Sequence, residues 1–392
     1  MPVKCNKSDY EYLMQCNKYS AQIWNACVKS DKEHNKITGK YLTRSELQFM
    51  MKKRVPIILA NSINFVILKY ITARDAMFRS IKANHKNSKK VKLPYKEKKY
   101  FNTGYTYQNI RIDKEKHLIT LARPLIIVDG KQTLQPRIKC HVKTIPDNIK
   151  EIELVYKNGL KLAIKYIEED NKQLIQSENE AAIDLGEIHS ITSIDNHGNG
   201  IIITGRKIRA IKQLRNKELA KLKSKRSKCT KDSRQYKRYS KAIYNLKYST
   251  DKKVLDCIHK TTKLYLDYCL RNNIGTVYYG DLDSVSRGTK QKEHGNKFVR
   301  QKLSQWCFGL LTSQLNNKLS RYGINFIKVK EYYTSQKCPA CKKRNKPKGR
   351  NYKCKCGYKM HRDINGAINI LNDNSKKYKI KECNTLKYLR IA

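Results

Sequence analysis

Acidic residues are scarce in this sequence of 392 residues. It contains 33 Asp and Glu against 84 Lys and Arg, which gives a formal net charge of +51 at pH 7. A compact protein with this excess would repel itself unless a polyanion neutralised it, and nucleic acid fits a positive charge that is spread over the whole length. The length allows two or three domains with a sizeable core.

Long apolar segments are also missing. No run reaches the roughly 20 apolar residues of a transmembrane helix, and no basic segment followed by an apolar one marks a secretory signal. Membrane binding, the other explanation for a basic surface, is therefore not expected, and we expect a soluble intracellular protein. No small-molecule substrate is expected either.

Tryptophan is rare, with two residues, whereas there are 26 Tyr that can offer stacking surfaces among the lysines. The 13 Cys are an odd number. In a reducing compartment most of them are small thiols, and they do not predict a disulfide framework.

Four of the cysteines form two close pairs in a lysine-rich segment, at residues 336–357. Cys338 and Cys341 are spaced C-x2-C, and Cys354 and Cys356 are followed by Gly357. This spacing lets four thiolates surround one structural Zn²⁺ ion. The alternative is four unrelated thiols in a basic loop, but two pairs this tight favour the metal.

An acidic residue lies on either side of this knuckle. Glu331 ends an apolar row on one face of a predicted strand, and Asp363 begins a predicted helix whose small residues Gly366 and Ala367 would allow close packing on a sheet. Each acid alone could be an ordinary strand-end or helix-capping residue.

The first half is expected to contain two domains. Residues 1–85 show apolar residues at every third or fourth position, which predicts a helical bundle. Residues 86–170 contain short alternating runs, and Asn158-Gly159 between two of them predicts a two-residue hairpin. We interpret this region as a small antiparallel β-barrel, followed by a polar linker at residues 171–180.

The second half predicts three strands, a long basic helical region, a strand, a helix, a strand and a final helix. This order, over residues 181–335 and 358–373, is that of an RNase H-like α/β fold with the knuckle inserted, and the whole chain is expected to be an α+β multidomain protein. Nucleases of this fold hold two Mg²⁺ ions with three or four carboxylates. Asp184, at the end of the first strand, and Asp363 fit that need. Residues 374–392 are expected to form a disordered basic tail.

Four segments of the second half are familiar together: IDLG around Asp184, YTSQKCPAC, C-x-C-G and RDINGAINI. They resemble the RuvC domain and zinc knuckle of the TnpB and Fanzor family, transposon-encoded RNA-guided DNA endonucleases that are also similar to type V CRISPR effectors. The resemblance covers the second half closely and the first half in layout. It implies that the helical bundle is a recognition lobe and the barrel a wedge domain that grips guide RNA.

One position departs from the family. Its usual middle glutamate falls on Gly280 here, in the stretch YYGDL, and glycine has no side chain that could bind metal. Some relatives combine GDL with a replacement glutamate where Glu331 stands, so the resemblance implies that Glu331 takes this role. Asp281 is the weaker candidate, because strand alternation turns it to the other face.

The resemblance thus implies an RNA-guided, Mg²⁺-dependent DNA endonuclease in which one RuvC site cuts both strands. Asp184, Glu331 and Asp363 would hold two Mg²⁺ ions, a guide RNA from the transposon end would pair with double-stranded DNA next to a short motif, and basic knuckle residues would bind nucleic acid. These basic residues are Lys342, Lys343, Arg344, Lys346 and Lys348. The protein would act in the bacterial cytoplasm or nucleoid, or in the nucleus of a eukaryote or viral host. A catalytically silent RNA-guided binder and, less favoured, a transposase remain as alternatives.

Overall fold

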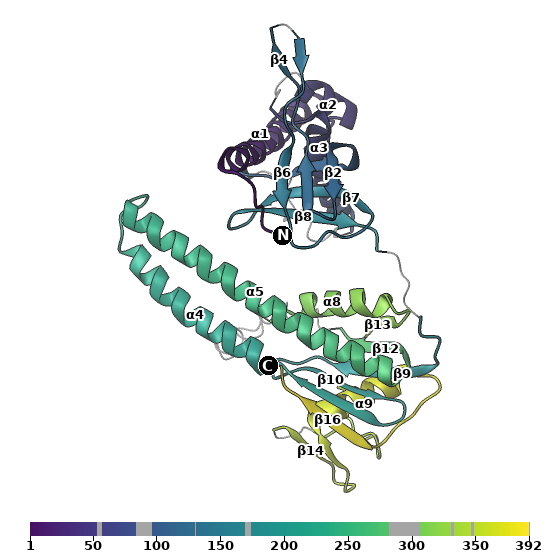
Figure 1. Ribbon diagram of the computed structural model, residues 1–392. Coiled ribbons are helices and arrows are strands. Elements are labelled where there is room, and N and C mark those ends of the chain that lie inside the picture. Colours follow the sequence, from purple (N-terminus) through teal and green to yellow (C-terminus); the bar gives the residue numbers. More distant parts are fainter. Residues whose placement is uncertain are drawn as a thin grey trace. The chain divides into compact units, whose positions relative to one another are not determined.

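The computed structural model describes residues 1–52, 57–83, 96–129, 131–168, 174–281, 306–330, 333–345 and 349–391. The chain divides into two compact units, Met1–Glu169 and Asp170–Ala392 (Figure 1). Among the described residues, no helix combines the length and the apolar character needed to cross a membrane.

The first unit begins with helices, as the apolar periodicity predicts. They are α1 (Lys7–Thr38), α2 (Arg44–Lys52) and α3 (Ala60–Ala83). Asn6 caps α1 by accepting a hydrogen bond from the Asp9 backbone N–H, and Gly39 ends the helix in a left-handed conformation. Leu13 and Trp24 of α1 pack with Val66 of α3 in the core.

The strands of this unit form separate small sheets. Their order is β1-β7-β8 in one sheet, β2-β3-β6 in a second and β4-β5 in a two-stranded ribbon. Their bounds are β1 (Thr103–Thr106), β2 (Ile110–Asp113), β3 (Leu118–Leu121), β4 (Ile126–Val128), β5 (Lys131–Thr133), β6 (Ile138–His141), β7 (Ile149–Tyr156) and β8 (Leu160–Tyr166), with a 3₁₀ turn η2 (Tyr107–Asn109). The expected hairpin at Asn158-Gly159 joins β7 and β8.

The expected barrel is not confirmed, because the described strands do not close into one sheet. The helices and strands of Met1–Glu169 lie in one compact unit. Buried residues of α1 and α3 belong to the same apolar core as Ile119 of β3 and Leu154 of β7. The sheets β1-β7-β8 and β2-β3-β6 each need an apolar surface to cover one face, and here the helices supply it, whereas the residues of β4 and β5 are exposed.

The second unit is built on one six-stranded mixed sheet of order β13-β12-β9-β10-β11-β16. The strands are β9 (Asn179–Asp184), β10 (His189–Asp195), β11 (Asn199–Thr204), β12 (Ile274–Gly280), β13 (Asn325–Val329) and β16 (Thr385–Leu389). β10 is antiparallel to both of its neighbours, while β12 is parallel to β9 and to β13. The first five strands occur in the predicted order.

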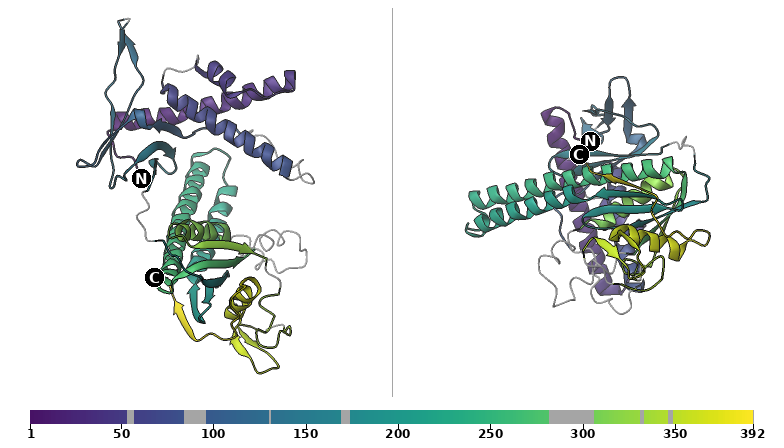
Figure 2. Two further views of the ribbon diagram at one scale, coloured as in Figure 1. Left: turned by 90° about the vertical axis from the view of Figure 1, so that its right-hand side faces the viewer. Right: turned by 90° about the horizontal axis from the view of Figure 1, so that it is seen from below.

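Helices cover both faces of this sheet. On one face Ile183 and Ile203 pack with residues of α5 (Arg234–Arg271) and α8 (Phe308–Ser320). On the other face Ala182 and Ile202 pack with α9 (Arg362–Asn374). Figure 2 shows α9 and the knuckle, in yellow, across the sheet from the green helices. The alternation of side chains along β9 therefore turns Asp184 toward α9, opposite Ile183.

The basic helical region is a two-helix hairpin. α4 (Arg206–Ser227) and α5 run side by side and extend beyond the sheet (Figure 1). The predicted break falls between them, where Ser233 caps α5 by accepting a hydrogen bond from the backbone N–H of Tyr236. Within α4, Ile208 and Lys212 are buried, so most of its basic side chains lie at the surface.

The prediction of a disordered C-terminal tail is wrong. β16 pairs in parallel with β11, and Ile391 is buried in the core on the α5 face. The high lysine content suggested disorder, but apolar residues at alternate positions are enough to add an edge strand to an existing sheet.

Candidate nuclease site and zinc knuckle

Asp184 ends β9 and lies against α9. A Cβ added at Gly366 would stand 2.5 Å from Asp184 Oδ2, so the glycine leaves space for the carboxylate. The small residues of α9 therefore do what the sequence predicts: they let the helix approach the strand that carries the acid. Asp184 and Asp363, 179 positions apart, line one cavity with a volume of about 330 Å³.

Asp363 lies in the first turn of α9, where the positive end of the helix dipole favours a carboxylate. Its Oδ2 atom accepts from Nδ1 of His189 at 2.8 Å and from Nη1 of Arg350 at 2.8 Å, and Arg362 Nε is 3.4 Å from Oδ1. Burial on its own raises the pKa of Asp363, but the hydrogen bond from His189 and the two guanidinium charges outweigh it, so the pKa is lowered. Asp363 is an ionised carboxylate at neutral pH.

The cavity combines anionic and cationic side chains. Its lining comprises Asp184, Leu185, Gly186, Glu187, Ile188, His189, Thr192, Thr334, Ser335, Arg350, Arg362 and Asp363. Carboxylate oxygens are the ligands that Mg²⁺ prefers, and guanidinium groups bind phosphate in a bidentate manner. The site can therefore accept a divalent cation together with a phosphodiester.

The Thr192 hydroxyl is a further feature that fits a bound cation. It pairs directly with Asp184 across the antiparallel strands β9 and β10. Its buried Oγ1 has no hydrogen-bonding partner among the described residues. Such an orphaned hydroxyl beside a carboxylate fits a hydrated, oxygen-ligated cation, because metal-bound water can satisfy it.

The four predicted zinc ligands lie together. The Sγ atoms of Cys338, Cys341, Cys354 and Cys356 are all within 4.8 Å of one another. Cys338 Sγ is 3.7 Å from Cys356 Sγ, and Cys341 Sγ is 3.5 Å from Cys354 Sγ. The first pair lies on a tight turn closed by the Lys342 N–H to the Cys338 carbonyl, and the second precedes Gly357, which has a positive φ of 91°. The arrangement is compatible with a four-cysteine zinc site.

Two of these thiols differ in their pKa. A backbone hydrogen bond at Cys356 lowers the pKa of Cys354 to about 7, whereas burial raises the pKa of Cys338 to about 12. Asn345 also donates from Nδ2 to Cys354 Sγ at 3.0 Å. A cation at the centre would stabilise all four thiolates, since a coordinating thiol loses its proton.

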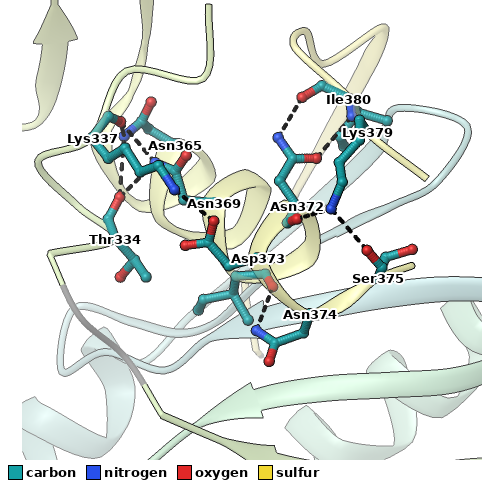
Figure 3. Close-up of polar contacts among 11 residues, drawn as sticks. Thr334, Lys337, Asn365, Asn369, Asn372, Asp373, Asn374, Ser375, Lys379 and Ile380 are labelled. Atoms are coloured by element: carbon teal, nitrogen blue, oxygen red, sulfur yellow. Dashed lines mark hydrogen bonds and ion pairs between the residues drawn. The ribbon is translucent and has the colours of Figure 1, made fainter. Parts of the chain in front are cut away.

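The knuckle is held to α9 by a group of asparagines (Figure 3). Asn369 Nδ2 donates to the backbone carbonyls of Thr334 and Lys337, each at 2.7 Å, and Asn365 Nδ2 contacts the same two oxygens at 3.4 and 3.1 Å. Lys337 Nζ is 2.6 Å from Asp373 Oδ1. The segment leading into the knuckle is thereby fixed to the helix that carries Asp363.

Of the basic residues expected to bind nucleic acid, Lys342, Lys343 and Arg344 are exposed on the knuckle. The Arg344 guanidinium lies over the Tyr333 ring, 4.1 Å from its centroid. Lys346 and Lys348 lie outside the described residues, and so does Glu331.

Gly280 lies on the face of β12 that carries the acids. It pairs with Val329 of β13, and both Val329 and Tyr278 pack on the α9 side of the sheet. Asp281 Oδ1 is 2.8 Å from Nζ of Lys328, a residue next to Val329 on β13. The glycine therefore stands on the α9 side of the sheet, the side to which Asp184 is turned.

Two residues of the site were not predicted. His189 is a strand residue five positions after Asp184, and Arg350 stands just before β14 (Asn351–Lys353), which forms a hairpin with β15 (Lys359–His361). The Arg362 N–H donates to the Arg350 carbonyl at 2.7 Å, which brings both arginines to Asp363. A histidine or arginine in a basic sequence carries no spacing signal, so pairing of the strands was needed to find them.

Two family models match parts of the second unit. A Cas12f1-like TNB domain matches residues 308–370, which include the four cysteines and Asp363, and a probable transposase family matches residues 163–286, which include Asp184. Over these two stretches the chain is similar to Cas12f1-like and transposase proteins. The predicted resemblance is thus confirmed.

Two curated relatives also match part of the chain. The chain is 32% identical over 123 residues to the CRISPR-associated endodeoxyribonuclease Cas12f1 of an uncultured archaeon, covering 29% of this chain and 22% of the relative. It is 31% identical over 100 residues to the TnpB-like protein ORF457 of Acidianus two-tailed virus, covering 25% of this chain and 20% of the relative. The matches thus span about a fifth of the length of these curated relatives.

The fold is similar to those of two solved structures. A Cas12f1–sgRNA–target DNA complex matches with a TM-score of 0.66 and 18% identity over 95% of this chain and 84% of that chain. The mini RNA-guided endonuclease CRISPR-Cas_phi3 matches with a TM-score of 0.52 and 10% identity over 93% of this chain and 90% of that chain. At these identities the likeness concerns the mixed α/β multidomain fold.

Proposed function

We propose that this protein is an RNA-guided DNA endonuclease with a single RuvC-type site. The observation that carries the proposal is the meeting of Asp184 and Asp363 in one cavity with two arginines. The names of the relatives, an endodeoxyribonuclease and a TnpB-like protein, support the same class of activity.

In this proposal Asp184 and Asp363 hold two Mg²⁺ ions together with a third acid. When bound, the ions would lower the pKa of an attacking water and stabilise the leaving oxygen. The protein's own contribution is to keep the Asp363 carboxylate ionised and to fix Asp184 in the space above Gly366.

Arg350 and Arg362 would hold the phosphodiester. Their side chains are 39% and 38% exposed, so a phosphate oxygen can reach both guanidinium groups. Asp363 would then exchange its ion pairs for the metal ions, while the arginines turn to the substrate. After this exchange Asp363 still faces positive charge, from the metal ions, and each arginine faces negative charge, from the phosphate.

We propose Glu331 as the third acid. It lies outside the described residues, so the support is its position in the sequence, two residues after Val329. A strand repeats its face every two residues, and Val329 belongs to the face that carries Gly280. Asp281 is less suitable, because its carboxylate pairs with Lys328.

The proposed partners are a guide RNA from the transposon end and double-stranded target DNA with a short adjacent motif. The complex of the structural relative with sgRNA and target DNA supports this choice, as does the net charge of +51. One structural Zn²⁺ in the knuckle would present Lys342, Lys343 and Arg344, and with them Lys346 and Lys348, to the DNA.

The test is cleavage of a target plasmid by protein purified with its flanking transposon-end RNA, in Mg²⁺ or in EDTA. We expect Mg²⁺-dependent cutting that falls by at least a hundredfold in Asp363→Ala and in Glu331→Ala. Asp281→Ala is the matched control and should retain activity. Cutting by Glu331→Ala at the wild-type rate would contradict its role as the third acid.

A catalytically silent guided binder is the second candidate, and Gly280 is the observation that favours it. If the wild-type complex binds its target and cuts nothing in Mg²⁺ or Mn²⁺, the protein is such a binder. A single Gly280→Glu substitution would then be the variant expected to gain cleavage.

A further inference from the structure

The C-terminal strand reaches the candidate nuclease site through the aromatic side chain of Tyr388. Tyr388 of β16 pairs in register with Ile202 of β11, on the face of the sheet that α9 covers. Its ring meets the His189 ring edge-on, with centroids 5.7 Å apart and planes at 89°. Tyr388 thus contacts the residue that donates to Asp363.

His189 differs from the other partners of Asp363 in its burial. It is 5% exposed, whereas the two arginines are open to solvent. Because an ionised carboxylate can only accept, Nδ1 of His189 carries the proton of the 2.8 Å hydrogen bond. A phosphate that recruits the arginines cannot displace this buried contact.

The start of the C-terminal segment is fixed in place (Figure 3). Asn372 donates to the Ile380 carbonyl at 2.7 Å and accepts from the Ile380 N–H at 2.8 Å, and Lys379 Nζ donates to the Ser375 carbonyl at 2.8 Å. Farther on, the Asn384 N–H donates to the Gly198 carbonyl at 2.8 Å. These bonds set the register of β16 and hence the position of Tyr388.

We propose that His189 is a positioning residue for Asp363 and that Tyr388 holds the His189 ring. The C-terminal strand is then part of the catalytic unit. This inference rests on the proposed function, because it assigns Asp363 to the metal ions. A buried donor to one oxygen fixes the rotation of the carboxylate and leaves its other lone pairs for metal.

The test compares His189→Ala, His189→Asn, Tyr388→Ala and Tyr388→Phe with wild type. Asparagine keeps an N–H near the place of Nδ1, and phenylalanine keeps the ring, so both should restore most of the function that alanine removes. Lys387→Ala is the matched control, because this exposed neighbour pairs with Ile201 and faces the other side of the sheet.

The primary readout is Mn²⁺ binding to the full-length protein with its zinc retained, followed by electron paramagnetic resonance, and its displacement by Mg²⁺. We expect His189→Ala to weaken Mg²⁺ binding about 10- to 100-fold, the usual effect of losing an outer contact of a metal ligand. Tyr388→Ala should weaken it several-fold. The second readout is the Mg²⁺ concentration for half-maximal cleavage, which should rise in parallel while target binding in EDTA stays at the wild-type level.

Several results would overturn the proposal. Wild-type Mg²⁺ binding in His189→Ala would show that His189 does not position the acid. An equal loss in Lys387→Ala and Tyr388→Ala would show that Tyr388 has no specific role in holding His189. If His189→Asn loses as much as His189→Ala while both melt at the wild-type temperature, the donor hydrogen bond is not the cause. The absence of cleavage in wild type would contradict the nuclease function, but the Mn²⁺ and Mg²⁺ measurements would still decide the role of His189.

Discussion

A substitution at Gly366 would move the Asp184 carboxylate and leave the packing of α9 in place. An alanine there would bring its Cβ within 2.5 Å of Asp184 Oδ2, the end of a movable side chain, so the carboxylate rather than the backbone would shift. We expect Gly366→Ala to cut at least tenfold more slowly with a melting temperature within a few degrees of wild type, as rate comparisons and thermal unfolding would show.

Gly309→Ala is the control for this prediction. Gly309 is also helical, in α8, and a Cβ at that position would meet nothing within 4 Å. Alanine favours a helix over glycine by about 1 kcal/mol, so this variant should be as stable as wild type or more stable, with unchanged cleavage. Equal rates for the two variants would mean that Asp184 does not need its present position.

Single residues were predictable where they carried a pattern. Asp184 at a strand end and Asp363 at a helix start have positions that periodicity reveals, and both line the cavity. His189 reaches Asp363 across 174 positions of sequence. Such a contact depends on which strands pair and on where α9 packs, so residue spacing gives no sign of it.

At the scale of elements, the four-cysteine knuckle contributes Arg350 to the candidate nuclease cavity. The β14–β15 hairpin carries Cys354 close behind Arg350, and Arg350 contacts Asp363. We expect one zinc per chain in wild type and none in Cys354→Ser, measured by elemental analysis after dialysis. Cleavage should fall together with zinc, because Arg350 loses its support.

Cys229→Ser is the control for the zinc prediction. Cys229 lies between α4 and α5, outside the four-cysteine cluster, so its replacement should change neither zinc content nor cleavage. Full zinc in Cys354→Ser would contradict the assignment of this residue as a ligand.

Glu153 of β7 makes the stability of the first unit depend on pH. It accepts from Lys69 Nζ at 2.9 Å and Asn102 Nδ2 at 2.9 Å and pairs with Lys165 Nζ at 2.6 Å. Burial alone raises the pKa of Glu153, but the hydrogen bonds from Lys165, Lys69 and Asn102 outweigh it and lower the pKa to about 2.

Because the folded pKa is lowered, the stabilisation by Glu153 is fully present above the unfolded pKa of about 4.3 and is lost as pH falls toward 2. We expect Glu153→Gln to reduce the free energy of unfolding by about 1–3 kcal/mol at pH 7. The difference from wild type in denaturant unfolding should shrink between pH 5 and pH 3. A constant difference over that range would contradict the lowered pKa.

The individual helices and strands were predicted better than the way in which they pack together. The helices of the first unit and the strands β9 to β13 follow from apolar periods, since a buried face leaves a regular trace in the sequence. The barrel is not confirmed and the disordered tail is wrong, because both depend on what a segment packs against. The first-unit strands share a core with α1 and α3, and residues 385–389 find a free edge beside β11.

For the whole molecule, the net charge of +51 and the acids Asp184 and Asp363 both fit the proposed action on nucleic acid. Spread positive charge binds nucleic acid without reading its sequence, and a metal-dependent site cuts any phosphodiester it reaches. Under the proposed function, specificity must therefore come from elsewhere, and base pairing with a guide RNA would supply it.

The most direct measurement of this central claim is guide exchange. Wild-type protein is purified with each of two transposon-end RNAs that differ in the pairing segment alone, and each complex is incubated with both matching target plasmids in Mg²⁺. Our account predicts that each complex cuts the plasmid that matches its guide and leaves the other intact. Cutting that is equal on both plasmids, or that proceeds without any guide RNA, would contradict it.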